Sequence, residues 1–200
     1  MVNSSKVYHE PPQERPILAA ANRAAGVGNC SVRGGGKMKS IIDVACGSKM
    51  FWFNNDNPIV EFVDKRLIDN HEYYPNRYIE IKPDTVADFT KLPYADKSFK
   101  LAVFDPPHLV QAGKTSWLRL KYGALDSGWP AMLHDGFWEC MRVLDDYGVL
   151  VFKWAETQIP LSKVLSAIQA EPLFGHKNGK YNKTHWLCFM KMDKQLEDAK

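Results

Sequence analysis

Four short apolar runs, the first three stopped by an acidic or glycine-containing turn, most constrain how this chain of 200 residues can fold. They lie at residues 40–45, 59–64, 100–104 and 149–152. Short runs that are apolar on both faces are typical of buried strands in a parallel sheet. Between and after them, residues 130–144 and 160–169 carry apolar side chains at helical spacing. This alternation predicts an α/β fold, with a parallel sheet and helices on both of its sides.

Three weaker strands complete the sheet, at residues 78–82, near 173–174 and at 185–190. The last two follow the final helix with only a loop between them, which predicts a hairpin at one side of the sheet. We therefore expect a doubly wound, mostly parallel, Rossmann-like sheet of seven strands, with an antiparallel last strand, in a single domain.

Charge and composition divide the chain unevenly. Residues 1–40 carry six basic and two acidic side chains, whereas the remaining residues carry 20 basic and 21 acidic ones. We expect a flexible basic N-terminal arm at 1–39, which is rich in Pro, Gly and Ala, a globular domain at 40–192 and a short tail at 193–200. The nearly neutral body does not support a polyanion-binding surface over the whole domain.

The four cysteines are far apart, so neither a zinc site nor a disulfide framework is predicted from them. No apolar run approaches the roughly 20 residues that a membrane-spanning helix needs. We therefore expect a cytoplasmic protein without a membrane segment and without a metal.

Chemistry-bearing residues follow four of the strands. In a doubly wound sheet, ligands bind where the carboxyl ends of the strands meet. Asp43–Ser48 includes Gly47, which would let the backbone approach a ligand closely. Asp64 lies 17 residues beyond Gly47, near the spacing expected for a carboxylate that accepts ribose hydroxyls. Asp88 follows the third strand, and Asp105 is fixed by two prolines after the fourth.

These segments, in this order, resemble the class I S-adenosylmethionine-dependent methyltransferases, and among them the amino-methyltransferases with an Asp-Pro-Pro-aromatic motif (adenine-N6 or cytosine-N4 type). Asp43–Ser48 resembles the Asp-Pro-Ala-Cys-Gly cofactor loop of adenine-N6 enzymes. The segment 92–99 (LPYADKSF) resembles the one that precedes the fourth strand in many members, and Gly148 begins a strand as in the family's fifth. The resemblance covers residues 40–192 and implies the class I methyltransferase fold.

The resemblance implies S-adenosylmethionine as the cofactor and a role for each matching residue. Asp64 would bind the ribose hydroxyls, and Asp88 the adenine amino group with Phe89 packed nearby. The methionine half of the cofactor would be lined by Asp43, Ala45, Cys46, Gly47 and Ser48. In the catalytic motif of Asp105, Pro106, Pro107 and His108, the Asp105 carboxylate and the Pro106 carbonyl would accept hydrogen bonds from a substrate NH₂, and His108 would stack on its ring.

Two positions depart from the family pattern. Lys49 replaces the second glycine of the loop, and the polar run 54–58 follows soon after, so the first helix must be short. His108 stands where Tyr, Phe or Trp is commoner, and it can also bind or release a proton. His108 weakens the assignment of the methyl acceptor to a nucleobase, so another amine is also compatible with the motif.

Basic and aromatic side chains are expected at the mouth of the site. The loop at 111–129 and that at 175–184 should both face it, and they contain six lysines and arginines. Such mixtures suit phosphate contacts and base stacking. As substrate-binding residues we predict Lys114, Trp117, Arg119, Lys121, Lys153 and His185.

The sequence thus predicts a methyltransferase that acts on an amino nitrogen, with an adenine or cytosine of RNA or DNA as the favoured acceptor. Two alternatives remain at this point. One is a methyltransferase for a small-molecule or protein amine, because no separate target-recognition domain follows the motifs. The other is a catalytically inactive relative that binds nucleic acid. Lys49 and the short first helix support this alternative.

Overall fold

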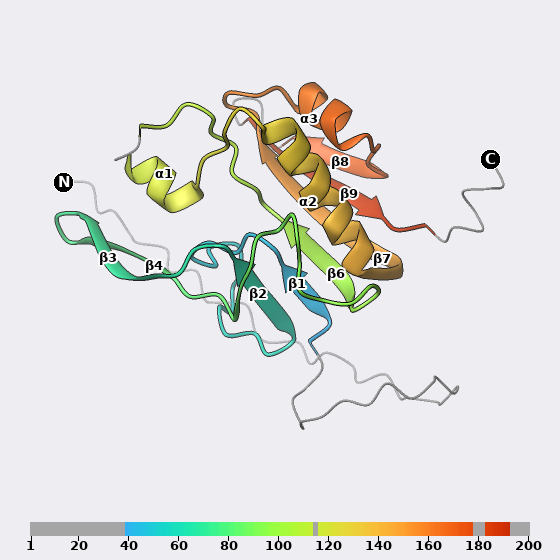
Figure 1. Ribbon diagram of the computed structural model, residues 1–200, viewed down its shortest axis with the longest axis horizontal. Coiled ribbons are helices and arrows are strands. Elements are labelled where there is room, and N and C mark those ends of the chain that lie inside the picture. The colour runs from blue at the N-terminus through green and yellow to red at the C-terminus, as the bar shows by residue number, and fades with distance from the viewer. Residues whose placement is uncertain (1–38, 114–115, 178–182, 193–200) are drawn as a thin grey trace, which may run out of the picture. The chain divides into compact units, whose positions relative to one another are not determined.

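A seven-stranded sheet forms the core of the described part of the chain (Figure 1). The computed structural model describes residues 39–113, 116–177 and 183–192. Most of the predicted arm, residues 1–38, and the tail lie outside the described residues. Across the sheet the strands are β5 (Thr85–Val86), β2 (Val60–Asp64), β1 (Ile41–Asp43), β6 (Phe99–Phe104), β7 (Leu144–Ala155), β9 (Thr184–Met190) and β8 (Phe174–Lys177).

The pairing confirms the predicted topology. The five strands from β5 to β7 run parallel, whereas β9 runs antiparallel to both β7 and β8. The predicted hairpin after the last helix is therefore β8–β9. β1 lies between β2 and β6, where Asp43 is aligned with Phe62 on one side and Val103 on the other. This register brings the carboxyl ends of the three strands together.

The third predicted strand was assigned to the wrong place. Residues 78–82 fall mostly in β4 (Arg77–Ile81), which pairs with β3 (Ile68–Tyr74) as a separate antiparallel hairpin. The strand that occupies the predicted place in the sheet is β5, which has two residues. A parallel connection is usually made by a helix. Here the hairpin stands in the connection between β2 and β5 (Figure 1).

Both longer helices pack on one face of the sheet. α2 (Trp129–Val143) contacts β6 and β7, and α3 (Leu161–Ile168) packs against α2 (Figure 1). Burial alternates along β7, where Leu150, Phe152 and Trp154 are fully buried beneath these helices. In the described residues no helix covers the opposite face, although helices were expected on both. The remaining described helix is α1 (Trp117–Tyr122).

No helix among the described residues has the length and apolar character needed to cross a membrane. The segment after β1, from Ala45 to Pro58, is a series of turns, so the short first helix expected here is absent and turns take its place. The rings of Trp52, from these turns, and Phe62 pack edge to face, with 5.6 Å between their centres.

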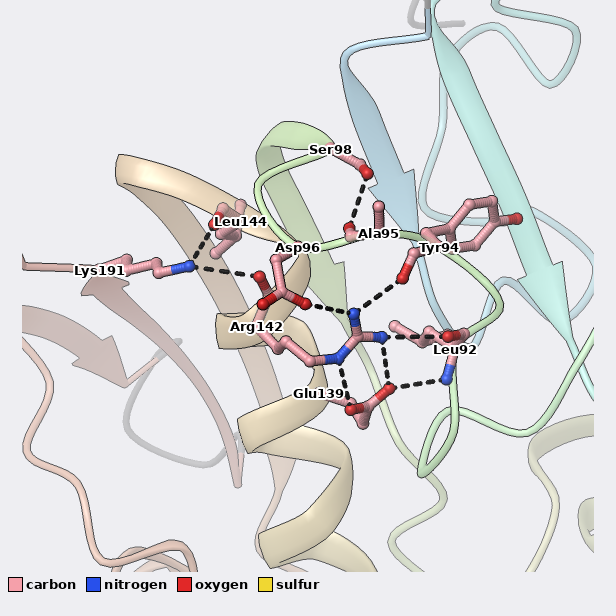
Figure 2. A network of polar contacts seen from close by, with 9 residues as sticks. All are labelled: Leu92, Tyr94, Ala95, Asp96, Ser98, Glu139, Arg142, Leu144 and Lys191. Carbon is pink, nitrogen blue, oxygen red and sulfur yellow. Dashed lines mark hydrogen bonds and ion pairs between the residues drawn. The ribbon is translucent and has the colours of Figure 1, made fainter. Parts of the chain in front are cut away.

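The segment 92–99 is held against α2 by one guanidinium (Figure 2). Arg142 forms a forked ion pair with Glu139 and donates to the backbone carbonyls of Leu92 and Tyr94 at 3.0 and 2.8 Å. It also binds the carboxylate of Asp96 at 2.8 Å. These bonds raise the pKa of Arg142 and lower that of Glu139. The network fixes the chain immediately before β6, which carries Asp105 at its far end.

Candidate active site

Three aspartates meet at the carboxyl ends of the central strands. Asp43 and Asp64 are the only buried charged residues in the described part of the chain, at 2% and 4% exposure. Asp105 follows β6, and its side chain is 31% exposed. Like charges brought together in a poorly solvated place repel one another. The negatively charged form of Asp43, the most deeply buried of the three, is therefore disfavoured.

The pKa of Asp43 is raised by its surroundings. Its complete burial raises its pKa to about 7, and the carboxylates of Asp105 and Asp64 add to the rise. The indole Nε1 of Trp52 donates to Oδ2 at 2.7 Å, and the backbone N–H of Ala45 donates to Oδ1 at 3.3 Å. These two bonds oppose the rise without cancelling it.

The loop after β1 has the backbone of a close-contact turn. Gly47 has φ +51°, and its N–H donates to Asp64 Oδ2 at 3.0 Å. Lys49, at the position of the family's second glycine, also has a positive φ of 56°, in the left-handed region that favours glycine. Its ammonium lies 4.3 Å from the centre of the Phe62 ring. Burial raises the pKa of the Cys46 thiol, so this residue is a neutral part of the loop and no thiolate.

Asp64 is already fully bonded. Besides the N–H of Gly47, it accepts Nε and Nη2 of Arg66 at 2.9 and 3.0 Å, a bidentate ion pair, and the Arg66 backbone N–H at 2.9 Å. Nη1 of the same guanidinium donates to the carbonyl of Leu120 in α1 at 3.0 Å. Arg66 therefore stands over the carboxylate predicted to bind ribose.

A cavity of about 390 Å³ opens at this end of the sheet. Ten predicted site residues line it, namely Asp43, Ala45, Cys46, Gly47, Ser48, Asp105, Pro106, His108, Lys121 and Lys153. Five residues that the sequence analysis did not single out line it as well, namely Met50, Phe51, Arg66, Tyr122 and Trp186. The cavity thus joins the predicted cofactor loop and the predicted catalytic motif.

Asp105 forms an ion pair inside this cavity. Its Oδ2 is bonded by the ammonium of Lys153 on β7, and its Oδ1 accepts no hydrogen bond from the described residues. Lys153 also lies 6.0 and 5.8 Å from the ring centres of Phe51 and Trp186. The register of β7 with β9 aligns Lys153 with Trp186, which explains how these two side chains come together.

His108 lies half-buried against two aromatic rings. Its centre is 5.8 Å from that of Tyr122, and it meets Trp154 edge-on at 6.4 Å. Burial lowers the pKa of His108, and Lys153 lowers it further, although Asp105 opposes them. The ring is therefore neutral at pH 7, and a neutral imidazole can accept a proton.

Three predicted residues lie to one side of the main cavity. Pro107, Asp64 and Phe89 line a smaller one of about 50 Å³. Phe89 belongs to the core, where the close approach of Gly136 in α2 leaves no room for a Cβ beside its ring. Asp88 lines neither cavity, and its Oδ1 accepts the backbone N–H of Thr90 at 3.0 Å and its hydroxyl at 2.9 Å. The adenine-binding role of Asp88 stays a prediction.

The predicted substrate residues are only partly brought together. Lys121 and Lys153 line the main cavity, whereas Trp117 and Arg119 lie on α1 beside it. His185 lies outside the cavity, with its Nε2 2.9 Å from Glu156. Lys114 falls outside the described residues.

The sequence contains only weak indications that the five additional residues line the cavity. Arg66 follows Asp64 by two positions, and Phe51 continues the cofactor loop. Trp186 neighbours His185, but adjacent residues of a strand point to opposite faces. Only the register with Lys153 shows that Trp186, and not His185, faces the cavity.

No family model matches the chain, and a search of curated proteins finds no relative. Solved structures with a similar fold include the PH0226 protein from Pyrococcus horikoshii, which is 16% identical in sequence. The alignment covers 78% of this chain and 83% of that one, with a TM-score of 0.48. An S-adenosylmethionine-dependent methyltransferase from Mesorhizobium loti is 12% identical, with 78% and 93% covered at 0.41. One from Leishmania major is 9% identical, with 78% and 66% covered at 0.44. All three TM-scores lie below 0.5.

Proposed function

We propose that this protein transfers a methyl group from S-adenosylmethionine to an amino nitrogen, with an exocyclic amine of adenine or cytosine in nucleic acid as the acceptor. The observation that carries the proposal is the shared cavity. It joins the Asp43–Ser48 loop to Asp105, Pro106 and His108 at the ends of two adjacent parallel strands.

The residues of the cavity suit this cofactor. S-Adenosylmethionine carries a cationic sulfonium and an ammonium group, and bound here it would supply an electrophilic methyl group. Asp43 is destabilised as an anion by burial and by its two neighbouring carboxylates, so a cation beside it would relieve the repulsion. Gly47 and Ser48 would hold the amino-acid end, where the glycine leaves the backbone open to a close approach.

Asp64 fits its proposed role only after a rearrangement. The guanidinium of Arg66 occupies both of its oxygens. Ribose hydroxyls would replace at least one of these bonds, and Arg66 would then keep its bond to Leu120 or turn into the cavity. A buried carboxylate tolerates this exchange because it remains hydrogen-bonded throughout.

Asp105 and the Pro106 carbonyl would orient the acceptor. Two oxygens that accept from one NH₂ group localise the nitrogen lone pair and stabilise the positive charge that develops on it. Lys153 fixes the carboxylate from the side of β7 and leaves Oδ1 for the substrate. His108, which lines the same cavity and is neutral, would receive the proton released from the methylated nitrogen. Most of the catalysis would be positioning.

A transfer assay with radiolabelled S-adenosylmethionine tests the proposal. Separate reactions with total RNA, DNA, protein and metabolites identify the acceptor class, so label in protein or metabolites alone would replace nucleic acid as the acceptor. Calorimetry with the cofactor comes first, since a protein that does not bind it cannot be this enzyme.

Asp105→Ala should lower the rate of methyl transfer about a hundredfold or more, the loss expected when a group that stabilises developing charge is removed. Asp105→Asn should retain part of the rate, because an amide oxygen still accepts a hydrogen bond. Asp135→Ala, on the exposed side of α2, is the matched control. If Asp105→Ala transferred methyl groups as fast as the unaltered protein, Asp105 would have no part in holding the amine.

A further inference from the structure

The β3–β4 hairpin displays aromatic side chains next to α1. Tyr74 and Tyr78 are 64% and 55% exposed, and Trp117 on α1 is 48% exposed. Tyr73 stacks on Trp117, with 6.3 Å between ring centres and 20° between their planes. Large exposed aromatic side chains gathered from two separate elements indicate a binding surface.

This aromatic surface is continuous with the candidate active site. A second cavity, of about 270 Å³, is lined by Tyr73 and Tyr78 from the hairpin. Its other walls include Ser48, Met50 and Lys121, and these three residues also line the main cavity. A ligand that enters the main cavity therefore has a path along Lys121 to the hairpin.

Cations surround the aromatic rings without carboxylate partners in the described residues. Arg77 lies 5.8 Å from the centre of the Tyr74 ring, and Lys121 5.2 Å from that of Tyr122. Arg119 on α1 is bonded only weakly, to a backbone carbonyl. The nearby acids have partners of their own, since Asp69 and Glu80 both pair with Lys82 and Glu72 accepts a backbone N–H at the turn. Glu80 also lines the second cavity.

We infer that the hairpin and α1 form a docking surface for single-stranded nucleic acid, on which bases next to the acceptor stack on Tyr78 and Trp117. The inference rests on the proposed function, and it names the part of the chain that selects the substrate. Aromatic faces stack on bases of any sequence, and cations between them attract the phosphates. A duplex keeps its bases stacked on one another, so it cannot use these faces.

Fluorescence anisotropy with labelled oligonucleotides of about 12 nucleotides tests the inference. One arm uses single-stranded DNA, one single-stranded RNA and one a DNA duplex, so that the first two arms distinguish the two sources of the same chemistry. The variants are Tyr78→Ala and Trp117→Ala. Tyr147→Ala is the matched control, because Tyr147 is 53% exposed on β7 and lines none of the cavities near the hairpin.

Each of the two variants should weaken single-strand binding about fivefold or more, while Tyr147→Ala leaves it unchanged. Calorimetry with S-adenosylmethionine on every variant separates this inference from the proposed function. Normal cofactor binding together with unchanged oligonucleotide affinity in both variants would overturn the inference alone, and so would tighter binding of the duplex. If the unaltered protein did not bind S-adenosylmethionine, the proposed function would be overturned instead.

Discussion

At the scale of single residues, Arg66 is the group that most needs to change its partners. Its guanidinium covers Asp64 and is anchored to α1 through Leu120. The same side chain therefore connects the predicted ribose site with the element that carries Trp117 and Lys121. Cofactor binding and the position of α1 should depend on each other.

Arg66→Met tests this dependence. Removing the guanidinium leaves buried Asp64 without its ion pair, which should lower the free energy of unfolding by about 3 kcal/mol. Ribose hydroxyls would then restore the missing bonds, so S-adenosylmethionine should raise the melting temperature of this variant more than that of the unaltered protein. Arg77→Met, at the tip of the hairpin, serves as the control in the same thermal scans. An equal or smaller shift in Arg66→Met would show that Asp64 does not bind the ribose.

Asp43 makes stability depend on pH. Its pKa is about 7 in the folded protein and 3.8 as the ordinary value, so the folded state holds this proton more tightly than the unfolded state does. Stability from this group is complete below pH 3.8 and is lost as the pH rises through 7, by an amount on the order of 4 kcal/mol. Asp43→Asn removes the titration.

The free energy of unfolding, measured by urea titration between pH 4 and pH 8, should consequently fall less with pH in Asp43→Asn than in the unaltered protein. Asp56→Asn, at an exposed turn, should follow the unaltered protein at every pH. Parallel curves for Asp43→Asn and the unaltered protein would mean that this carboxyl is ionised normally.

At the scale of elements, the connection between segment 92–99 and α2 depends on Arg142. Arg142→Ala leaves the carbonyls of Leu92 and Tyr94 without their donor and leaves Glu139 with only the backbone N–H of Leu92, and should cost about 2–3 kcal/mol in urea unfolding. Arg142→Lys keeps the charge but loses the fork, so it should recover less than half of the loss. Lys100→Ala removes an exposed ion pair with Asp145 and should cost within about 1 kcal/mol. Similar losses in Arg142→Ala and Lys100→Ala would show that the network adds no more than a surface pair.

β2 and β6 could be predicted because a strand that is buried on both faces is a run of mostly apolar residues. The centre of β7 is fully buried only at alternate positions, but the residues between them are apolar as well, so it forms a similar run. The first strand of the β3–β4 hairpin contains no such apolar run. Most of β3 is exposed and polar on both faces, so neither alternation nor an apolar run marks it. The usable signal was the turn at Pro75-Asn76, where Asn76 has a positive φ of 60°.

At the scale of the whole molecule, the sequence predicted that chemistry-bearing residues gather at the carboxyl ends of the strands, and the structure brings Asp43, Gly47 and Asp105 together there. The sequence did not predict how these residues pair with others. These residues could be found because Asp43 ends β1, Gly47 lies in the turn that follows, and Asp105 comes directly after β6. The bond between Asp105 and Lys153 depends on the register of β6 with β7, and the position of Trp186 depends on that of β7 with β9. Registers between distant segments come from packing of the folded chain, which local sequence does not encode.

The lengths of the outermost strands also have a consequence for how copies of this protein behave at high concentration. The sheet ends in β5, with two residues, and in β8, with four. Outer strands this short offer few unpaired N–H and C=O groups as a template for another chain. A sheet of seven strands, largely apolar within, is in this way protected against aggregation by strand addition at its two sides.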